Sequence, residues 1–250
     1  MKLRELVDHL DAYLRVADVP DSTRAWNGLQ LENGGTATRV AAAVDASEAA
    51  VAAAADAGCD VLLVHHGLFW GGFAPVTDRR YRKLKRALDA GLAIYSAHLP
   101  LDVHPEVGNN AVLASRLGIE AAGRFGSYDG HEIGVWGRLD TDREALARRL
   151  SDLVGGPVHV VRGGPARIAS VGVITGGAGE MIGDALAAGL DAFVTGEGAH
   201  HTYFDAVEGG INVYYAGHYA TETWGVRALA EHIESRFGLP WQFIDQPTGL

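Results

Sequence analysis

Hydrophobic and polar positions follow one another along the chain in blocks that predict strand-then-helix units. The N-terminal segment has its apolar residues at helical spacing. These residues are Leu3, Leu6, Val7, Leu10 and Leu14. A short apolar run at Arg39–Val44 then predicts a strand, and the Ala-rich segment Ala46–Ala57, closed by Gly58, predicts a helix.

The same alternation continues through most of the sequence. The run Asp60–Val64 is apolar at every position after the aspartate, which is typical of a strand covered on both faces in an α/β sheet. The other predicted strands are Leu92–Ser96, His131–Leu139 and Pro157–Val161. The other predicted helices are Tyr81–Ala90, Asn109–Leu117 and Asp142–Leu153.

The second half of the chain repeats the first. Val40–Asp60 aligns with Val171–Asp191 without a gap, at an offset of 131 residues. Ile94–Asp102 aligns with Tyr214–Glu222 at an offset of 120, and a shorter connection explains the change. We therefore predict an α/β fold of two interlocked, internally repeated lobes, residues 1–125 and 126–250.

Side chains that can hold a metal ion occur at the repeated positions. His65 and His66 close one predicted strand, and an H-x3-acid motif follows another strand in each half. The two motifs are His98 with Asp102 and His218 with Glu222. Ligands bind at the carboxyl ends of strands in α/β sheets, and imidazole and carboxylate suit Zn, Mn, Fe, Co and Ni. Each motif alone is weak, and together they predict a metal site between the lobes.

A proline affects the first motif. On a helix the i, i+4 spacing would place His98 and Asp102 on one face, but Pro100 disfavours a helix there.

Composition excludes several classes of function. The chain is 48% hydrophobic, enough for a packed core, and its net charge of −10 argues against nucleic acid and anionic membranes as partners. The single cysteine, Cys59, allows neither an internal disulfide nor a Cys-rich metal site. No segment predicts a membrane span or a signal peptide, so we expect a cytoplasmic protein.

Five motifs occur in a fixed order and identify a family. They are WNGLQLENG (Trp26–Gly34), LLVHHGLFWGG (Leu62–Gly72), SAHLPLDVHPEVGNN (Ser96–Asn110), VTGEGAHH (Val194–His201) and AGHYATE (Ala216–Glu222). Over nearly its whole length the sequence resembles the Nif-three-like dinuclear metal centre family, often named GTP cyclohydrolase I type 2. The length fits the short form, which lacks the domain inserted between the halves of longer relatives.

The resemblance implies a ligand set and an assembly. The implied metal ligands are His65, His66, Asp102, His218 and Glu222. Glu222 would bridge two divalent ions, with His65 and His218 completing one ion and His66 and Asp102 the other. The resemblance also implies a ring-shaped homo-hexamer, while the identity of the two metal ions (Zn, Fe, Mn, Co or Ni) stays open.

Two metal ions bridged by a carboxylate suit hydrolysis, because they lower the pKa of water and polarise the electrophile. We therefore expect a metal-dependent hydrolase with a small-molecule substrate, and the family name points to opening of the purine ring of GTP. Glu222 and His98 are the expected catalytic residues, with His98 or His104 moving the proton. The alternatives are hydrolysis of another small molecule and a non-catalytic metal-binding hexameric ring that regulates or scaffolds a partner.

Three further features have two interpretations each, and a fourth has one. The arginines after the HHGLFWGG loop either hold phosphate or form a solvated helix face; they are Arg79, Arg80, Arg82 and Arg86. The GGAGE segment at Gly176–Glu180 is either a phosphate loop or an ordinary glycine-rich helix entry. Asn27 and Gln30 either orient ligands or satisfy the backbone of a turn, and Glu197, aligned with His66, is expected to point toward the same site.

Overall fold

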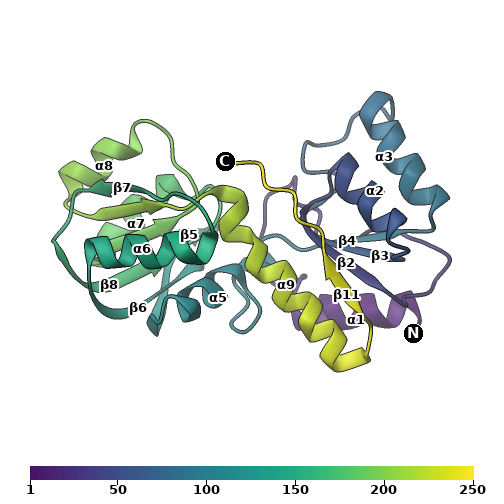
Figure 1. Cartoon of the computed structure of the whole chain (residues 1–250), viewed down its shortest axis with the longest axis horizontal. Helices are drawn as coiled ribbons and strands as arrows, with labels where there is room; N and C mark the ends of the chain where they lie inside the picture. The colour runs from purple at the N-terminus through teal and green to yellow at the C-terminus, as the bar shows by residue number, and fades with distance from the viewer. The chain divides into compact units, whose positions relative to one another are not determined.

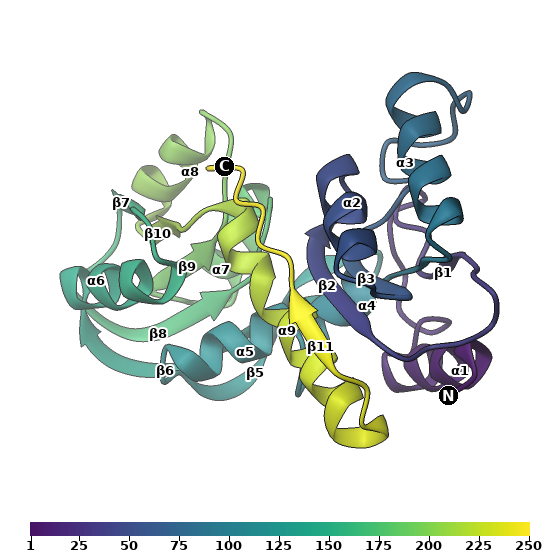
Figure 2. The same cartoon turned by 45° about the vertical axis from the view of Figure 1, so that its right-hand side comes forward.

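The computed structural model describes all 250 residues and divides them into two compact units (Figures 1 and 2). The first unit is Met1–Val107 with Gly225–Gln246, and the second is Gly108–Trp224 with Pro247–Leu250. Each unit contains one sheet and several helices, so the predicted α/β class is confirmed. The division at residues 125 and 126 stays a prediction. None of the helices combines the length and apolarity that crossing a membrane requires.

The sheet of the first unit has five strands in the order β1-β4-β3-β2-β11. Four of them run parallel, and β1 pairs antiparallel at one edge. The strands are β1 (Gly28–Leu31), β2 (Val40–Asp45), β3 (Val61–His66), β4 (Ala93–Ser96) and β11 (Trp241–Phe243).

Helices cover both faces of this sheet (Figure 1). Helix α1 (Leu3–Tyr13) and the later turns of α9 (His218–Phe237) pack on the face that contains Val61 and Leu63. Helices α2 (Glu48–Asp56) and α3 (Asp78–Asp89) pack on the opposite face, with Leu62 and Val64. Every residue of β3 is therefore buried, as its continuous apolar run predicts, and the five apolar residues of the N-terminal helix are buried too.

The sheet of the second unit has six strands in the order β5-β6-β8-β9-β10-β7, of which β8, β9 and β10 are parallel. The strands are β5 (Glu120–Tyr128), β6 (His131–Asp142), β7 (His159–Arg162), β8 (Arg167–Val173), β9 (Ala192–Thr195) and β10 (Asn212–Tyr215). Helices α5 (Asn109–Arg116) and α6 (Arg143–Val154) share a core with this sheet. Helices α7 (Ile182–Ala187) and α8 (Thr202–Gly209) lie together on its other side (Figures 1 and 2).

Strand register supports the internal repeat. In β2 and β3, Val40 pairs with Val61; in β8 and β9, Val171 pairs with Ala192. Both partners are shifted by the predicted 131 residues.

The register also corrects the second offset by one residue. Val61 pairs with Ala93, whereas its equivalent Ala192 pairs with Asn212. Strand β10 therefore aligns with β4 at an offset of 119 residues (212 minus 93), one less than the predicted 120. Tyr95 and Tyr214, both fully buried, become the equivalent residues. The additional residue, Gly217, has a φ of +91° and precedes His218. An apolar pattern does not locate an insertion in a loop, which is why the sequence alignment placed it wrongly.

Two equivalent aspartates fix the starts of equivalent strands. Asp60 accepts hydrogen bonds from the backbone amides of Thr38 and Arg39, at 2.9 and 3.1 Å. Asp191, 131 residues later, accepts from the amides of Ala169 and Ser170, at 2.8 and 3.0 Å. A threonine or serine hydroxyl donates to each carboxylate as well. Asp60 and Asp191 therefore make the same hydrogen bonds to two consecutive backbone amides at equivalent positions of the two units.

We expect Asp60→Ala and Asp191→Ala each to lower the free energy of unfolding by about 1–3 kcal/mol, since each removes hydrogen bonds to a charged acceptor. Urea unfolding followed by circular dichroism measures both losses. Asp56→Ala is the control, because its exposed carboxylate pairs only with Arg86 and is expected to cost less than about 1 kcal/mol. A loss at Asp191 but none at Asp60 would contradict an equivalent role.

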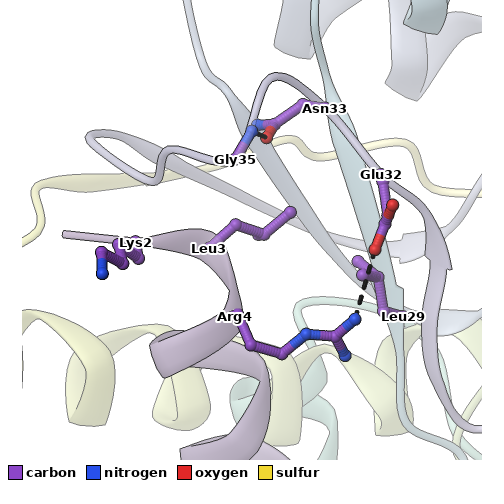
Figure 3. Close-up of a pocket in the computed structure, with 7 residues that line it drawn as sticks. All are labelled: Lys2, Leu3, Arg4, Leu29, Glu32, Asn33 and Gly35. Atoms are coloured by element: carbon purple, nitrogen blue, oxygen red, sulfur yellow. Dashed lines mark hydrogen bonds and ion pairs between the residues drawn. The ribbon is translucent and has the colours of Figure 1, made fainter.

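A hollow of about 470 Å³ lies beside the start of α1 in the first unit (Figure 3). Arg4 and Glu32 form an exposed ion pair across it, with 3.4 Å between Nη2 and Oε1. The Asn33 side chain accepts a hydrogen bond from the amide of Gly35 at 2.8 Å. Arg4, Glu32 and Asn33 thus already have partners within this hollow.

Candidate metal centre

Strand β3 carries the first two predicted ligands to its carboxyl end. His65 is fully buried, and its Nδ1 lies 2.9 Å from the carbonyl oxygen of Ala97. His66 is 8% exposed, and its Nδ1 lies 2.9 Å from Oδ1 of Asp45, the last residue of β2. Both partner atoms are acceptors, so each Nδ1 donates its proton.

His98 is held by a network that the sequence did not reveal. Its Nδ1 donates to Oδ1 of Asp21 at 2.8 Å, and its backbone amide donates to Oδ1 of Asn27 at 2.7 Å. Asp21 also accepts from the amide of Leu99. Burial raises the pKa of the Asp21 carboxyl, but the hydrogen bonds from His98, Asn27 and Leu99 outweigh burial and the pKa falls below its usual value. Asp21 thus stays ionised and fixes the His98 ring, and Asn27 supports the same turn.

The three imidazoles form one donor cluster in the first unit. With each Nδ1 donating, the lone pair that can bind a metal lies on Nε2. One ring nitrogen from each of His65, His66 and His98 lies within 4.8 Å of the others. Metal-binding histidines characteristically give their other ring N–H to a carboxylate or carbonyl oxygen, as all three do here. The residues present therefore fit a divalent transition metal.

Asp102 lies beside this cluster on the one-turn helix α4 (Leu99–Asp102). Pro100 was expected to disfavour a helix here, and the structure contradicts that expectation. Pro100 stands in the first turn, where the helix needs no donor from it, and the amide of Asp102 bonds to the carbonyl of His98 at 3.0 Å. The turn brings Oδ2 of Asp102 to 3.6 Å from Nε2 of His65.

The second unit repeats the arrangement at the start of α9. Nδ1 of His218 donates to Oε1 of Glu197 at 2.7 Å, and its Nε2 lies 3.2 Å from Oε2 of Glu222, one turn later. Burial lowers the pKa of His218, but Glu222 and Glu197 outweigh burial and raise it to about 9. Glu197 therefore supports a predicted ligand, as its alignment with His66 suggested.

The glycine-rich segment lies against this pair. A Cβ on Gly176 would overlap Oε1 of Glu222, and Gly176 has a φ of +69°. A Cβ on Gly177 would touch the ring of His218 and the carboxylate of Glu197. The absence of side chains at these two positions leaves space for Glu222 and His218. This packing accounts for the glycines of the segment without a phosphate-binding role.

Two other groups of histidines lie apart from the donor clusters. Nδ1 of His104 accepts from the amides of Glu106 and Val107 at 3.2 Å, and its ring packs on Tyr13 at 4.3 Å between ring centroids. This contact pattern makes His104 a turn-forming residue and does not support the predicted proton shuttle. His200 and His201 are exposed before α8.

Comparisons with known proteins agree with the motifs. The sequence model of the family Duf34/NIF3 (NGG1p interacting factor 3) matches residues 1–248. A Deinococcus radiodurans protein named GTP cyclohydrolase 1 type 2 homolog is 46% identical over 98% of this chain and 94% of its own length. A Halobacterium salinarum protein of the same name is 43% identical over the whole of both chains.

Solved structures give the same result over the full length. The structure of protein ybgI, described as of unknown function, has a TM-score of 0.93 and 37% identity and covers 100% of both chains. The crystal structure of TTHA1606 from Thermus thermophilus has a TM-score of 0.89 and 44% identity, again covering 100% of both chains. The chain belongs to the Duf34/NIF3 family.

Proposed function

We propose that this chain is a dinuclear metal-dependent hydrolase. The proposed ligands are His65, His66, Asp102, His218 and Glu222, with Glu222 bridging two divalent ions. Nitrogen and carboxylate donors in this mixture suit Zn, Fe, Mn, Co or Ni. The names of the relatives, GTP cyclohydrolase 1 type 2 homolog, make a purine nucleotide the first substrate to test.

One observation carries the proposal. Four buried or half-buried imidazoles, His65, His66, His98 and His218, each give Nδ1 to an oxygen acceptor. Orienting an imidazole in this way costs side-chain entropy and desolvates polar atoms. The same orientation at four histidines therefore favours a shared functional role over four separate structural contacts. The pattern leaves Nε2 of His65, His66 and His218 for the proposed metal ions and Nε2 of His98 for the proposed proton transfer.

The proposed reaction is hydrolytic opening of the imidazole ring of GTP. The oxygen of a water molecule bonds to C8, the C8–N9 bond breaks, and the two protons of the water end on N7 and N9. Bound metal ions would polarise the electrophile and lower the pKa of the water. His98, oriented by Asp21, is the residue we assign to the proton that reaches N9.

Elemental analysis of the protein, purified without a His tag, tests the metal proposal. We expect about two divalent ions per chain, and a loss of purine absorbance when GTP is added. Absence of metal, even after incubation with Zn, Mn, Fe and Co, would overturn the hydrolase. Two bound ions without turnover of GTP would instead favour a different substrate or a metal-binding ring that regulates a partner.

Family membership also underlies two wider proposals. We propose that the chain assembles into a homo-hexamer and acts in the cytoplasm on a small-molecule substrate. The acidic net charge of −10 supports the exclusion of nucleic acid as a partner.

A further inference from the structure

A second, shallow hollow in the first unit lies between α3 and the loop that follows His66. Most of its walls are apolar, and two cationic side chains also face it. The lining includes Leu68, Phe69, Phe73, Val76, Arg80 and Lys83. Apolar walls that carry a few polar groups are typical of a small-molecule site.

The two cations in this hollow have no carboxylate within ion-pair distance. Nη1 of Arg80 donates to the carbonyl of Gly72 at 2.9 Å, and Nζ of Lys83 donates to the carbonyl of Ala46 at 2.5 Å. Burial lowers the pKa of Lys83 and the positive charges of Arg79 and Arg80 lower it further, while Glu48 and Asp45, which lie beyond ion-pair distance, act in the opposite direction. The hollow therefore carries positive charge that no ion pair neutralises.

The other cations of α3 are neutralised. Arg82 pairs with Glu48 at 2.7 Å and Lys85 with Asp89 at 2.6 Å, and Arg86 pairs with Asp56. The arginine cluster thus divides. Arg82 and Arg86 belong to a solvated, ion-paired face, whereas Arg80 faces the hollow. The contrast also separates this hollow from the one beside α1, where Arg4 pairs with Glu32.

Two phenylalanine rings line the hollow, and one of them also contacts an exposed tryptophan outside it. Phe73 is 69% exposed, and its ring lies 5.2 Å from Phe69 and 5.0 Å from Trp26, which is 50% exposed. Gln30 fixes this group, because it accepts from the amide of Leu68 and donates to the carbonyl of Trp26, both at 2.6 Å. Exposed aromatic rings held in place present π-faces on which a planar ring can stack.

The same loop reaches the candidate metal ligands. Trp70, next to Phe69, lies with its ring 4.7 Å from that of His66 and 4.5 Å from that of His98. Phe69 lines the hollow, and the next residue, Trp70, contacts the imidazole cluster, so one loop joins the hollow to the candidate ligands.

We propose that this hollow is the substrate-recognition site, and that it takes an aromatic ring carrying a phosphate group. Phe73 would stack on the ring, and Arg80 with Lys83 would bind the phosphate oxygens. This inference rests on the proposed hydrolase and narrows its substrate class to phosphorylated aromatic compounds, of which a purine nucleotide is one.

Binding of GTP and of guanosine to the full-length chain, measured by calorimetry, tests the phosphate contact. Arg80→Gln is expected to weaken GTP binding about 10- to 100-fold and to leave guanosine binding unchanged, because only GTP offers the anion. Arg82→Gln makes the same change on the same helix, at an ion-paired position, and should leave both affinities unchanged. Equal effects of the two variants, or none, would overturn the phosphate site.

The aromatic contact has its own pair of variants. Phe73→Ala is expected to weaken GTP and guanosine alike, about 5- to 100-fold, since stacking does not depend on the phosphate. Tyr81→Ala removes another exposed aromatic ring from α3, outside the hollow, and should change neither affinity. Retained guanosine binding in Phe73→Ala would contradict the stacking role.

A third variant separates this inference from the proposed hydrolase. In Glu222→Ala the hollow is intact, so GTP should still bind and Arg80→Gln in that background should still weaken it. Loss of turnover with retained binding in the Glu222→Ala protein would support both statements. Arg80-dependent binding in a wild-type protein that holds no metal would support the hollow and overturn the hydrolase.

Discussion

Replacing Glu222 with alanine is expected to remove most of the bound metal, with both ions lost together. The proposed bridging carboxylate serves both ions, and even partners of ligands change metal affinity by about 10- to 100-fold when they are removed. Elemental analysis before and after dialysis measures the loss. A ligand that binds only the folded state also stabilises it, by about 2.7 kcal/mol at 100 times its dissociation constant, so the melting temperature should fall as well.

Variants at single-ion positions sharpen this result. His66→Ala and Asp102→Ala should each remove mainly one ion, leaving about half of the wild-type content. His201→Ala removes an exposed histidine before α8 and should leave the metal content unchanged. Unchanged metal in Glu222→Ala, or equal losses in all four variants, would contradict the proposed ligand set.

Gly176→Ala is expected to abolish metal binding almost as fully as loss of the carboxylate itself. The added Cβ would overlap Oε1 of Glu222 and come close to Nε2 of His218, so the carboxylate must leave its position. The substitution adds a single methyl group and leaves Glu222 in the sequence, so the expected loss of metal comes from displacement of the carboxylate and not from its removal. Metal content and GTP turnover should both fall at least about 10-fold, the effect of a misplaced ligand.

Backbone strain alone would not give this result, and Gly189→Ala provides the control. Gly189 has the same φ of +69°, but no atom lies within 4 Å of its added Cβ. Both substitutions therefore carry the cost of a left-handed alanine, about 1 kcal/mol, which unfolding experiments measure. Only Gly176→Ala should lose metal. Loss of metal in both variants would assign the effect to folding and not to Glu222.

The sequence predicted most of the elements that are buried on one or both faces. Burial generates the apolar pattern, so α1, β3 and α6 could be found from their residues. Strand β5 was missed because its first residues are exposed and it contains two glycines, and β11 is only three residues long. Elements that bury little leave no periodic signal.

The candidate site was predictable only in part. Repeated imidazoles and carboxylates at strand ends pointed to His65, His66, His98, Asp102, His218 and Glu222. Asp21 was not predicted, because it lies in a loop 77 residues from His98 and matches no motif. The recognition hollow was also missed, since helix α3 and the loop after His66 form its walls only in the folded chain.

The offset between the two halves has an evolutionary consequence at Gly176. In the repeat, Gly176 corresponds to Asp45, which supports His66, and Glu197 corresponds to His66 itself. The second unit thus has a carboxylate where the first has an imidazole, and it has no side chain at 176, where Glu222 lies. Because any side chain at 176 would collide with Glu222, the effects of substitutions at positions 176 and 222 depend on each other. Position 176 is therefore expected to accept a larger residue only where position 222 carries a shorter side chain.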